Sequence, residues 1–200
     1  MGALMMPVAP QPEWPRPPAG GYTADDLDRL PNLPPHTELI DGSLVFVSPQ
    51  TAFHTLTMRL LDDRIARCAP PDHLVFREMT IALDARSRPE PDIMVVHSEA
   101  FTSLAQTSFK PSDVVLAIEV VSPDSEARDR QRKPVLYAAA GIPHFWRVEE
   151  DRGQAVVHVF ELEDGKDTYT AKDVFREQLK VAAPFPVEID LRDVDPRRRA

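Results

Sequence analysis

The chain is 200 residues long, enough for one domain with a sizeable core. Its hydrophobic content of 42% and charged content of 28% are typical of a globular protein, and no apolar run approaches the roughly 20 residues of a membrane helix. The formal net charge of −9 argues against nonspecific wrapping of nucleic acid, because that affinity comes from Lys and Arg side chains on phosphates. A basic patch confined to one site is still compatible with this charge.

The first 20 residues are rich in proline and predict a flexible tail, since this composition buries too little apolar surface to offset the cost of ordering. They have no basic region before a brief apolar run and therefore do not resemble a secretory signal. The single cysteine, Cys68, cannot form an internal disulfide, which favours a cytoplasmic protein. One domain is expected over residues 21–195, followed by a basic tail over residues 196–200.

A short helix and a hairpin are the first predicted elements. Thr23 and Asp26 have the form of a capping box for a helix of about two turns. The dipeptide Asp41-Gly42 is the strongest short hairpin signal. It joins two predicted strands, residues 37–40 and 43–47.

A longer helix and the main strands follow. Apolar residues recur at helical spacing from Thr51 to Cys68, with Thr51 placed to cap the start, which predicts an amphipathic helix lying on a sheet. Residues 74–83 and 92–96 predict two strands of one sheet. Residues 114–121 are apolar at almost every position, a pattern typical of a central strand covered on both faces.

A second helix and two more strands are predicted further along the chain. Pro134 is tolerated in the first turn of a helix, so this helix is expected to begin near residues 130–131 and to end at Gly141. Residues 144–148 and 155–162 predict strands joined by a tight turn. Beyond them, strand fragments and turns are expected.

Glu119 is the most informative residue, because it lies inside the central apolar run. An unpaired buried charge is costly, so this carboxylate needs a partner. A structural salt bridge to Lys133 or to an arginine, a metal-ligand role and an acid–base role all remain open. Asp92, which opens an apolar strand, and Glu38, at the start of the hairpin, are each compatible with ordinary strand-start positions.

The combination of these residues favours a metal site. Carboxylates on neighbouring strands supply hard oxygen ligands for Mg²⁺, which prefers a few carboxylates together with waters and substrate phosphate. Such an ion polarises a phosphodiester and lowers the pKa of a bound water, while an ammonium such as that of Lys133 stabilises the developing negative charge.

Further polar residues are predicted near this site. His54 follows its helix cap by three residues and would reach the same end of the sheet, although a packing role also fits. Tyr137 lies four residues after Lys133 on one helical face, where packing is again the alternative. Three arginines predict either a solvated loop or a phosphate-contact patch at a helix N-terminus: Arg128, Arg130 and Arg132.

An ordered set of motifs resembles the Uma-type family of putative restriction endonucleases over about residues 36–170. The set comprises Glu38-Leu39-Ile40-Asp41-Gly42, His54, Pro91-Asp92, Glu119-Val120-Val121-Ser122-Pro123, Asp129, Lys133, Tyr137, Gly141-Ile142-Pro143 and Phe145-Trp146. The family belongs to the PD-(D/E)xK nuclease superfamily. The resemblance therefore implies an α/β fold with a restriction-endonuclease-like central mixed sheet flanked by helices, and a site that uses Mg²⁺, with Mn²⁺ as a substitute.

The resemblance also implies residue roles. Asp92 and Glu119 match the metal ligands, and Glu38 matches an additional acidic position. The standard pattern has its lysine two residues after the second acid, where this chain has Val121. In Uma-type sequences a lysine on the following helix replaces it, which matches Lys133.

Functions of two classes remain compatible with the sequence. The first is a Mg²⁺-dependent endonuclease that hydrolyses phosphodiester bonds, with DNA as the expected substrate and RNA as an alternative, acting alone or as a homodimer. The second is a non-catalytic protein that keeps the nuclease fold and binds a protein or a nucleic acid, which the acidic charge favours. Binding of a divalent ion through Asp92 and Glu119 distinguishes the two.

Overall fold

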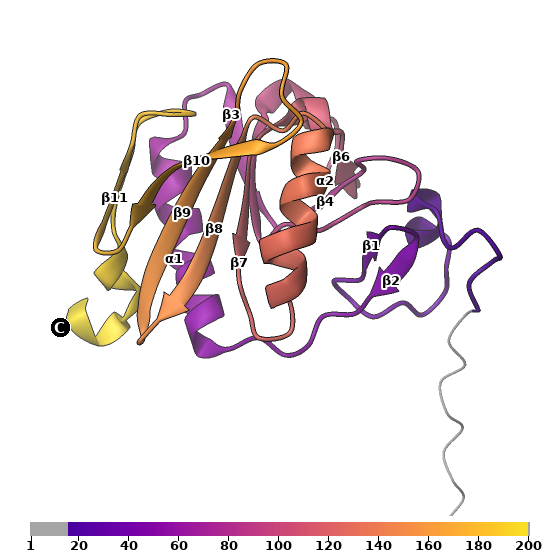
Figure 1. Cartoon of the computed structure of the whole chain (residues 1–200), viewed down its shortest axis with the longest axis horizontal. Helices are drawn as coiled ribbons and strands as arrows, with labels where there is room; N and C mark the ends of the chain where they lie inside the picture. The colour runs from indigo at the N-terminus through magenta and orange to yellow at the C-terminus, as the bar shows by residue number, and fades with distance from the viewer. Residues whose placement is uncertain (1–15, 200) are drawn as a thin grey trace, which may run out of the picture.

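A six-stranded mixed sheet forms the centre of the computed structural model, which describes residues 16–199 (Figure 1). Most of the predicted N-terminal tail, residues 1–15, lies outside the described residues. The strand order is β10-β9-β8-β7-β5-β3, and only β7 and β8 pair in parallel within this sheet. The strands are β3 (His73–Arg77), β5 (Ile93–His97), β7 (Val114–Val120), β8 (His144–Asp151), β9 (Gln154–Leu162) and β10 (Tyr169–Phe175). The predicted mixed sheet is confirmed.

Strand β7 lies in the middle of the sheet, and every one of its residues is buried. Successive side chains of a strand point to opposite faces. Ile118 and Val120 accordingly pack in one hydrophobic core, whereas Ala117 packs in the core on the other face. The prediction of a central strand covered on both faces is confirmed, and Glu119 shares a face with Ala117.

Helix α1 (Ala52–Cys68) covers one face of the sheet, together with the hairpin of β11 (Gln178–Val181) and β12 (Val187–Asp190). Leu61 and Ile65 of α1 are completely buried there. Full burial of a side chain of this size contributes about 1.5–3 kcal/mol. The predicted amphipathic helix is confirmed.

Helix α2 (Lys133–Ala139) covers the opposite face and appears in front of the sheet in Figure 1. It continues from a π-helical turn, η4 (Arg128–Arg132), so the helical backbone begins slightly before the predicted residues 130–131. Pro134 stands at the start of α2, directly after the π-helical turn, in which the Lys133 N–H bonds to the Arg128 carbonyl five residues before it. Tyr137 is fully buried, with its ring centroid 5.8 Å from that of Phe145.

The predicted hairpin forms a separate two-stranded unit beside the sheet, made of β1 (Glu38–Ile40) and β2 (Ser43–Val45). Its turn residues Asp41 and Gly42 have φ angles of 52° and 79°, as a two-residue hairpin turn of the primed type requires. A Cβ at Gly42 would also collide with the guanidinium of Arg86. Glycine is therefore favoured here by its backbone conformation, and a larger residue would also displace the Arg86 guanidinium.

The single strand predicted over residues 74–83 is wrong, because the chain breaks at Glu78. This residue has a φ of 52°, which separates β3 from β4 (Thr80–Ile81). Strand β4 leaves the main sheet and pairs in parallel with β6 (Ser108–Phe109). The break turns the backbone at Glu78 beside the site described below.

Short helices complete the described chain. The predicted two-turn helix after Thr23 is a single short 3-10 helix, in which Asp26 accepts a hydrogen bond from the Thr23 backbone N–H at 2.7 Å. The 3-10 helices are η1 (Ala24–Asp28), η2 (Ser98–Ala100), η3 (Pro111–Asp113), η5 (Leu191–Val194) and η6 (Pro196–Arg199).

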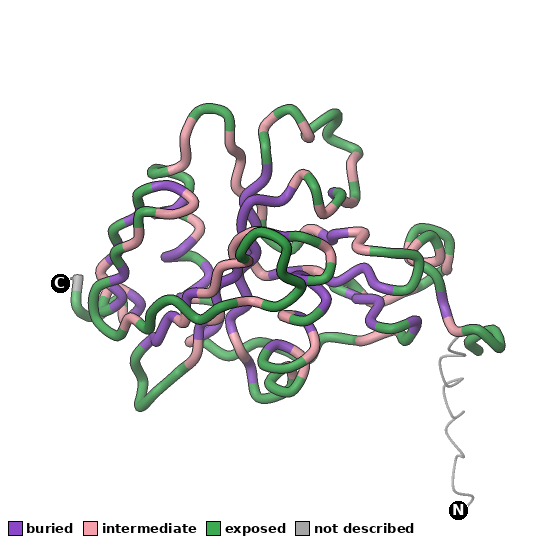
Figure 2. The backbone as a smooth tube through the Cα atoms, turned by 45° about the horizontal axis from the view of Figure 1, so that its top comes forward, coloured by how far each residue is buried: buried purple, intermediate pink, exposed green. Residues whose placement is uncertain are grey.

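Burial follows the arrangement of the sheet. Figure 2 shows the buried segments gathered at the centre of the molecule and the exposed ones in the loops around it. Of the helices in the described part of the chain, none combines the length and the apolar character needed to cross a membrane.

Candidate active site

A cavity of about 410 Å³ opens at the end of β7, between the β1–β2 hairpin and the start of α1. Its lining is strongly acidic, with seven carboxylates against two permanent cations. The carboxylates are Glu38, Glu78, Glu90, Asp92, Glu119, Asp124 and Asp129, and the cations are Arg128 and Lys133. A cavity with this excess of carboxylates over cations attracts positively charged ligands.

Asp92 and Glu119 come together from neighbouring antiparallel strands. Ile93, the first residue of β5, pairs with Ile118 of β7, so Asp92 just before this pair and Glu119 just after it lie at the same end of the two strands. The carboxylate of Asp92 is held by the backbone N–H of Val120, which donates to Oδ2 at 2.6 Å.

Lys133 lies at the centre of a buried group of three carboxylates. Its Nζ is 2.8 Å from Glu38 Oε1, 2.9 Å from Glu119 Oε2 and 3.4 Å from Asp129 Oδ1. All four side chains are 4% exposed or less. The lysine on α2 thus contacts Glu119 of β7.

Two of these carboxylates accept hydrogen bonds from further donors, Glu119 on its other oxygen and Glu38 on the same oxygen that contacts Lys133. The hydroxyl of Tyr137, one turn after Lys133, donates to Glu119 Oε1 at 2.6 Å. The backbone N–H of Glu90 donates to Glu38 Oε1 at 2.8 Å. Two parts of the chain therefore supply the donors that fix these carboxylates: the segment before β5 and α2.

Burial and charge set the protonation of this group. Burial acts to lower the pKa of Lys133, but Glu119, Glu38 and Asp129 together raise it well above its usual value. Burial raises the pKa of Glu119 well above its usual value, against the effect of Lys133 and with added repulsion from Asp129. Lys133 therefore keeps its proton, while the carboxylates around it repel one another.

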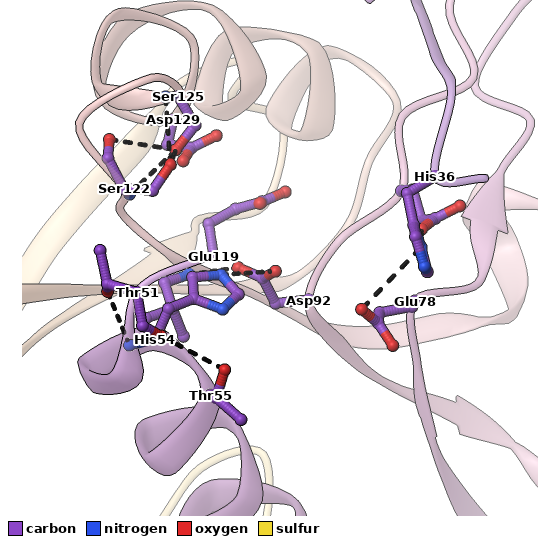
Figure 3. A network of polar contacts seen from close by, with 12 residues as sticks. His36, Thr51, His54, Thr55, Glu78, Asp92, Glu119, Ser122, Ser125 and Asp129 are labelled. Carbon is purple, nitrogen blue, oxygen red and sulfur yellow. Dashed lines mark hydrogen bonds and ion pairs between the residues drawn. The ribbon is translucent and has the colours of Figure 1, made fainter. Parts of the chain in front are cut away.

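His54 lies at the start of α1 and contacts Asp92. Its Nε2 is 3.0 Å from Asp92 Oδ1, and the two side chains point toward each other in Figure 3. Burial acts to lower the pKa of His54, but the hydrogen bond to Asp92 raises it above its usual value. The N-cap places this ring, because Thr51 Oγ1 accepts a hydrogen bond from the His54 backbone N–H at 3.2 Å.

The predicted arginines do not lie together. Arg128 lines the cavity. Arg130 pairs with Glu149, at 2.5 Å, and with Glu126, while Arg132 pairs with Asp41 of the hairpin turn. The structure brings Arg128 to the site and leaves Arg130 and Arg132 outside the cavity.

Asp129 belongs to the motif set described above, but no role was predicted for it. One turn before Lys133, it is 1% exposed, and its Oδ1 is close enough to Lys133 for ion pairing but makes no hydrogen bond. Burial raises the pKa of its carboxyl above the usual value. The four-residue spacing from Lys133 was the available signal, since such residues share a helical face.

A turn of two serines carries the chain from β7 into η4. Ser122 and Ser125 hydrogen-bond each other, with 3.0 Å between their hydroxyl oxygens, and the backbone carbonyl of Ser125 accepts from the N–H of Asp129 at 2.9 Å (Figure 3). On the far rim, His36 Nδ1 lies 2.6 Å from Glu90 Oε1. The sequence offered no signal for this histidine, because its partner is 54 residues away.

The donor set fits a hard divalent cation. Within residues 16–199, no three His, Cys, Asp or Glu side chains are arranged to hold a metal by themselves. Mg²⁺, however, is usually bound by one or two carboxylates, with waters and phosphate completing its shell. Asp92 and Glu119 each use two of about four lone-pair positions in the contacts above. Together with the unbonded Oδ1 of Asp129, they retain oxygen donors for such an ion.

The mixed sheet between helices, with paired carboxylates and a lysine at the ends of its central strands, defines the restriction-endonuclease-like class of α/β fold. The chain belongs to the Uma2 family, described as "Putative restriction endonuclease", whose model matches residues 24–193. It is also similar to the crystal structure of a putative nuclease belonging to DUF820 from Anabaena variabilis, with a TM-score of 0.67 and 20% identity. That similarity covers 86% of this chain and 96% of the other. No curated protein matches the chain.

Proposed function

We propose that this protein is a Mg²⁺-dependent endonuclease that hydrolyses phosphodiester bonds in DNA, with Mn²⁺ as a substitute ion. The observation that carries this proposal is the buried contact of Lys133 with Glu119, beside Asp92 on the neighbouring strand, at the base of an acidic cavity. Membership of a family described as restriction endonucleases supports it.

Asp92 and Glu119 would hold the ion, which when bound polarises the phosphodiester and lowers the pKa of a bound water. His54 and the backbone N–H of Val120 orient Asp92. Tyr137 orients Glu119 in the same way. Such supporting contacts fix the direction in which carboxylates offer their oxygens.

Lys133 acts in this proposal as a fixed positive charge. Because its pKa is raised well above the usual value, it does not take a proton from water at neutral pH. It stabilises negative charge that develops on the phosphate. Glu38, on the opposite side of the ammonium, orients the attacking water, and Arg128 contacts the phosphate from the cavity wall.

The test combines cleavage with metal binding by the purified full chain. Supercoiled plasmid and single-stranded DNA are each incubated with Mg²⁺ or Mn²⁺, and binding of Mn²⁺ is measured by calorimetry. Asp92→Asn and Glu119→Gln should each reduce both cleavage and Mn²⁺ affinity by about 100-fold or more, because each removes a charged ligand. Glu163→Gln, an exposed acid paired with Lys172, serves as the control and should change neither.

Absence of both nicking and metal binding in the wild-type protein would refute the proposal. The net charge of −9 favours a second candidate, a non-catalytic binding protein with the same fold. That protein would have no need for a divalent ion at Asp92 and Glu119. Metal binding without cleavage of any nucleic acid would favour a different substrate.

A further inference from the structure

We infer that the nucleic acid taken by this cavity is a single-stranded segment and not a continuous duplex. The inference rests on the proposed function, since it names the substrate form for the same site. Three features of the molecule support it: the depth of the reacting groups, the size and walls of the cavity, and the charge at its mouth.

The reacting groups lie too deep for a regular duplex. The side chain of Glu119 is 2% exposed and that of Lys133 is 4% exposed, whereas Asp92 is 18% exposed. A scissile phosphate must therefore enter the cavity to approach them. Within a stacked duplex the backbone cannot bend into a pocket without unstacking its bases, and this distortion costs a few kcal/mol.

The walls of the cavity enclose a space for one nucleotide. One wall comes from the segment between β2 and α1, with Val47, Ser48, Pro49 and Gln50, and the facing wall includes Pro35 and His36. The cavity volume of about 410 Å³ lies within the range of pockets that hold a single small molecule. A single strand with free backbone rotation can insert one nucleotide and leave its neighbours outside.

The charge around the cavity also disfavours a duplex. A duplex carries one negative charge per about 1.7 Å of its axis. Seven carboxylates line the cavity, and Arg130 and Arg132 outside it are paired with Glu149 and Asp41, so these arginines offer no basic track along the mouth. Val47, which lines the cavity, is 40% exposed, and apolar surface of this kind binds the bases of a single strand.

The experiment uses one labelled DNA sequence in three forms: single strand, full duplex, and duplex with an unpaired internal bubble. With Mg²⁺ and the full chain, the single strand should be cut about tenfold faster than the duplex or more, because it carries about half the charge per unit length and inserts a nucleotide without breaking a base pair. The bubble substrate should be cut within its unpaired segment. Equal or faster cleavage of the full duplex would overturn the inference.

A matched pair of variants tests the cavity wall. Val47→Glu adds a negative charge at the mouth and should slow cleavage of the single strand about fivefold or more. Val174→Glu places the same change at a similarly exposed valine on the edge strand β10, outside the cavity, and should leave the rate unchanged. Equal effects of the two substitutions would count against the inference.

Binding separates this inference from the proposed catalysis. Fluorescence anisotropy of the same labelled DNA is measured with Ca²⁺, which takes the same oxygen ligands as Mg²⁺. Tighter binding of the single strand without cleavage of any form would refute the proposed catalysis and support the inference. Tighter binding of the duplex, or binding of neither form, would refute the inference.

Discussion

At the scale of single residues, Lys133 is held by several buried contacts at once. One buried ammonium contacts Glu38, Glu119 and Asp129, so the group as a whole carries excess negative charge. Buried ion pairs contribute little net stability compared with apolar replacements, but removal of one partner is strongly destabilising. This arrangement makes the lysine necessary for the fold as well as for the proposed chemistry.

Replacement of the lysine should therefore destabilise the protein. Lys133→Met leaves three buried carboxylates without a cation and should lower the free energy of unfolding by about 3–5 kcal/mol, measured by urea denaturation at neutral pH. The control Lys172→Met removes an exposed lysine that pairs with Glu163 and should cost less than about 1 kcal/mol. Adding Glu119→Gln to Lys133→Met should restore part of the loss. An unchanged midpoint in Lys133→Met would contradict the ion-pair network.

Asp129 should contribute to metal binding more than to stability. Its pKa is raised by burial, and Asp92 and Glu38 add repulsion, so Asp129→Asn relieves unfavourable charge while keeping the shape of the side chain. We expect an unchanged or higher free energy of unfolding and about tenfold weaker Mn²⁺ binding by calorimetry. Asp63→Asn, on the exposed side of α1, is the control. Unchanged Mn²⁺ affinity in Asp129→Asn would remove this residue from the site.

At the scale of elements, the start of α1 and the turn into α2 position three site residues: His54, Asp129 and Lys133. The cap of α1 at Thr51 orients His54, and the π-helical turn η4 places Asp129 and Lys133 toward the cavity. Single π-helical turns are frequent at functional sites. The ion pair of Arg132 with Asp41 joins this turn to the hairpin that carries Glu38.

Removal of the cap should therefore affect both stability and the site. Thr51→Ala loses the side-chain acceptor for the His54 N–H and should lower the free energy of unfolding by about 1 kcal/mol. Thr51→Ser keeps the acceptor and should behave like the wild type. The histidine resonance of His54, followed by NMR, should titrate at lower pH in Thr51→Ala, because its contact with Asp92 raises its pKa. An unchanged titration would show that the cap does not position the ring.

At the scale of the whole molecule, Arg88 joins segments that are distant in sequence. Its guanidinium pairs with Asp28 Oδ2 at 2.6 Å and donates from Nε to Thr80 Oγ1 at 2.8 Å. Its backbone pairs with Leu39 of the hairpin. The arginine is 4% exposed and thus ties the N-terminal segment and the hairpin to β4.

Replacement of Asp28, the ion-pair partner of Arg88, should change the free energy of unfolding in a pH-dependent way. The hydrogen bond from Arg88 lowers the pKa of Asp28 below its usual 3.8, so this contact stabilises the fold above that pH and is lost as pH falls through the lowered pKa. Asp28→Asn should cost about 1–3 kcal/mol at pH 7, since Asp28 is half-exposed and Arg88 is not. The difference from wild type in urea denaturation should shrink below pH 4. A difference that grows in acid would contradict this assignment.

Local signals predicted several elements correctly. The Asp41-Gly42 turn, the capped helix α1 and the fully apolar strand β7 each depend on neighbouring residues, which a sequence displays directly. The break at Glu78 was not predicted, because the residues around it continue a strand pattern. Glu78 has a positive φ, which non-glycine residues seldom adopt, and after it β4 pairs with β6 and not within the main sheet.

The sequence by itself determined that Glu119, inside an apolar strand, needs a partner, since an unpaired buried charge is costly in any fold. The motif order named Asp92, Glu38 and Lys133 beside it. Only the tertiary structure decided that Lys133 is shared by three carboxylates, that Asp129 is one of them, and that two of three predicted arginines lie elsewhere. These contacts join residues up to 95 positions apart in the sequence, from Glu38 to Lys133. Sheet register and helix packing bring such residues together in space, and no local sequence pattern encodes them.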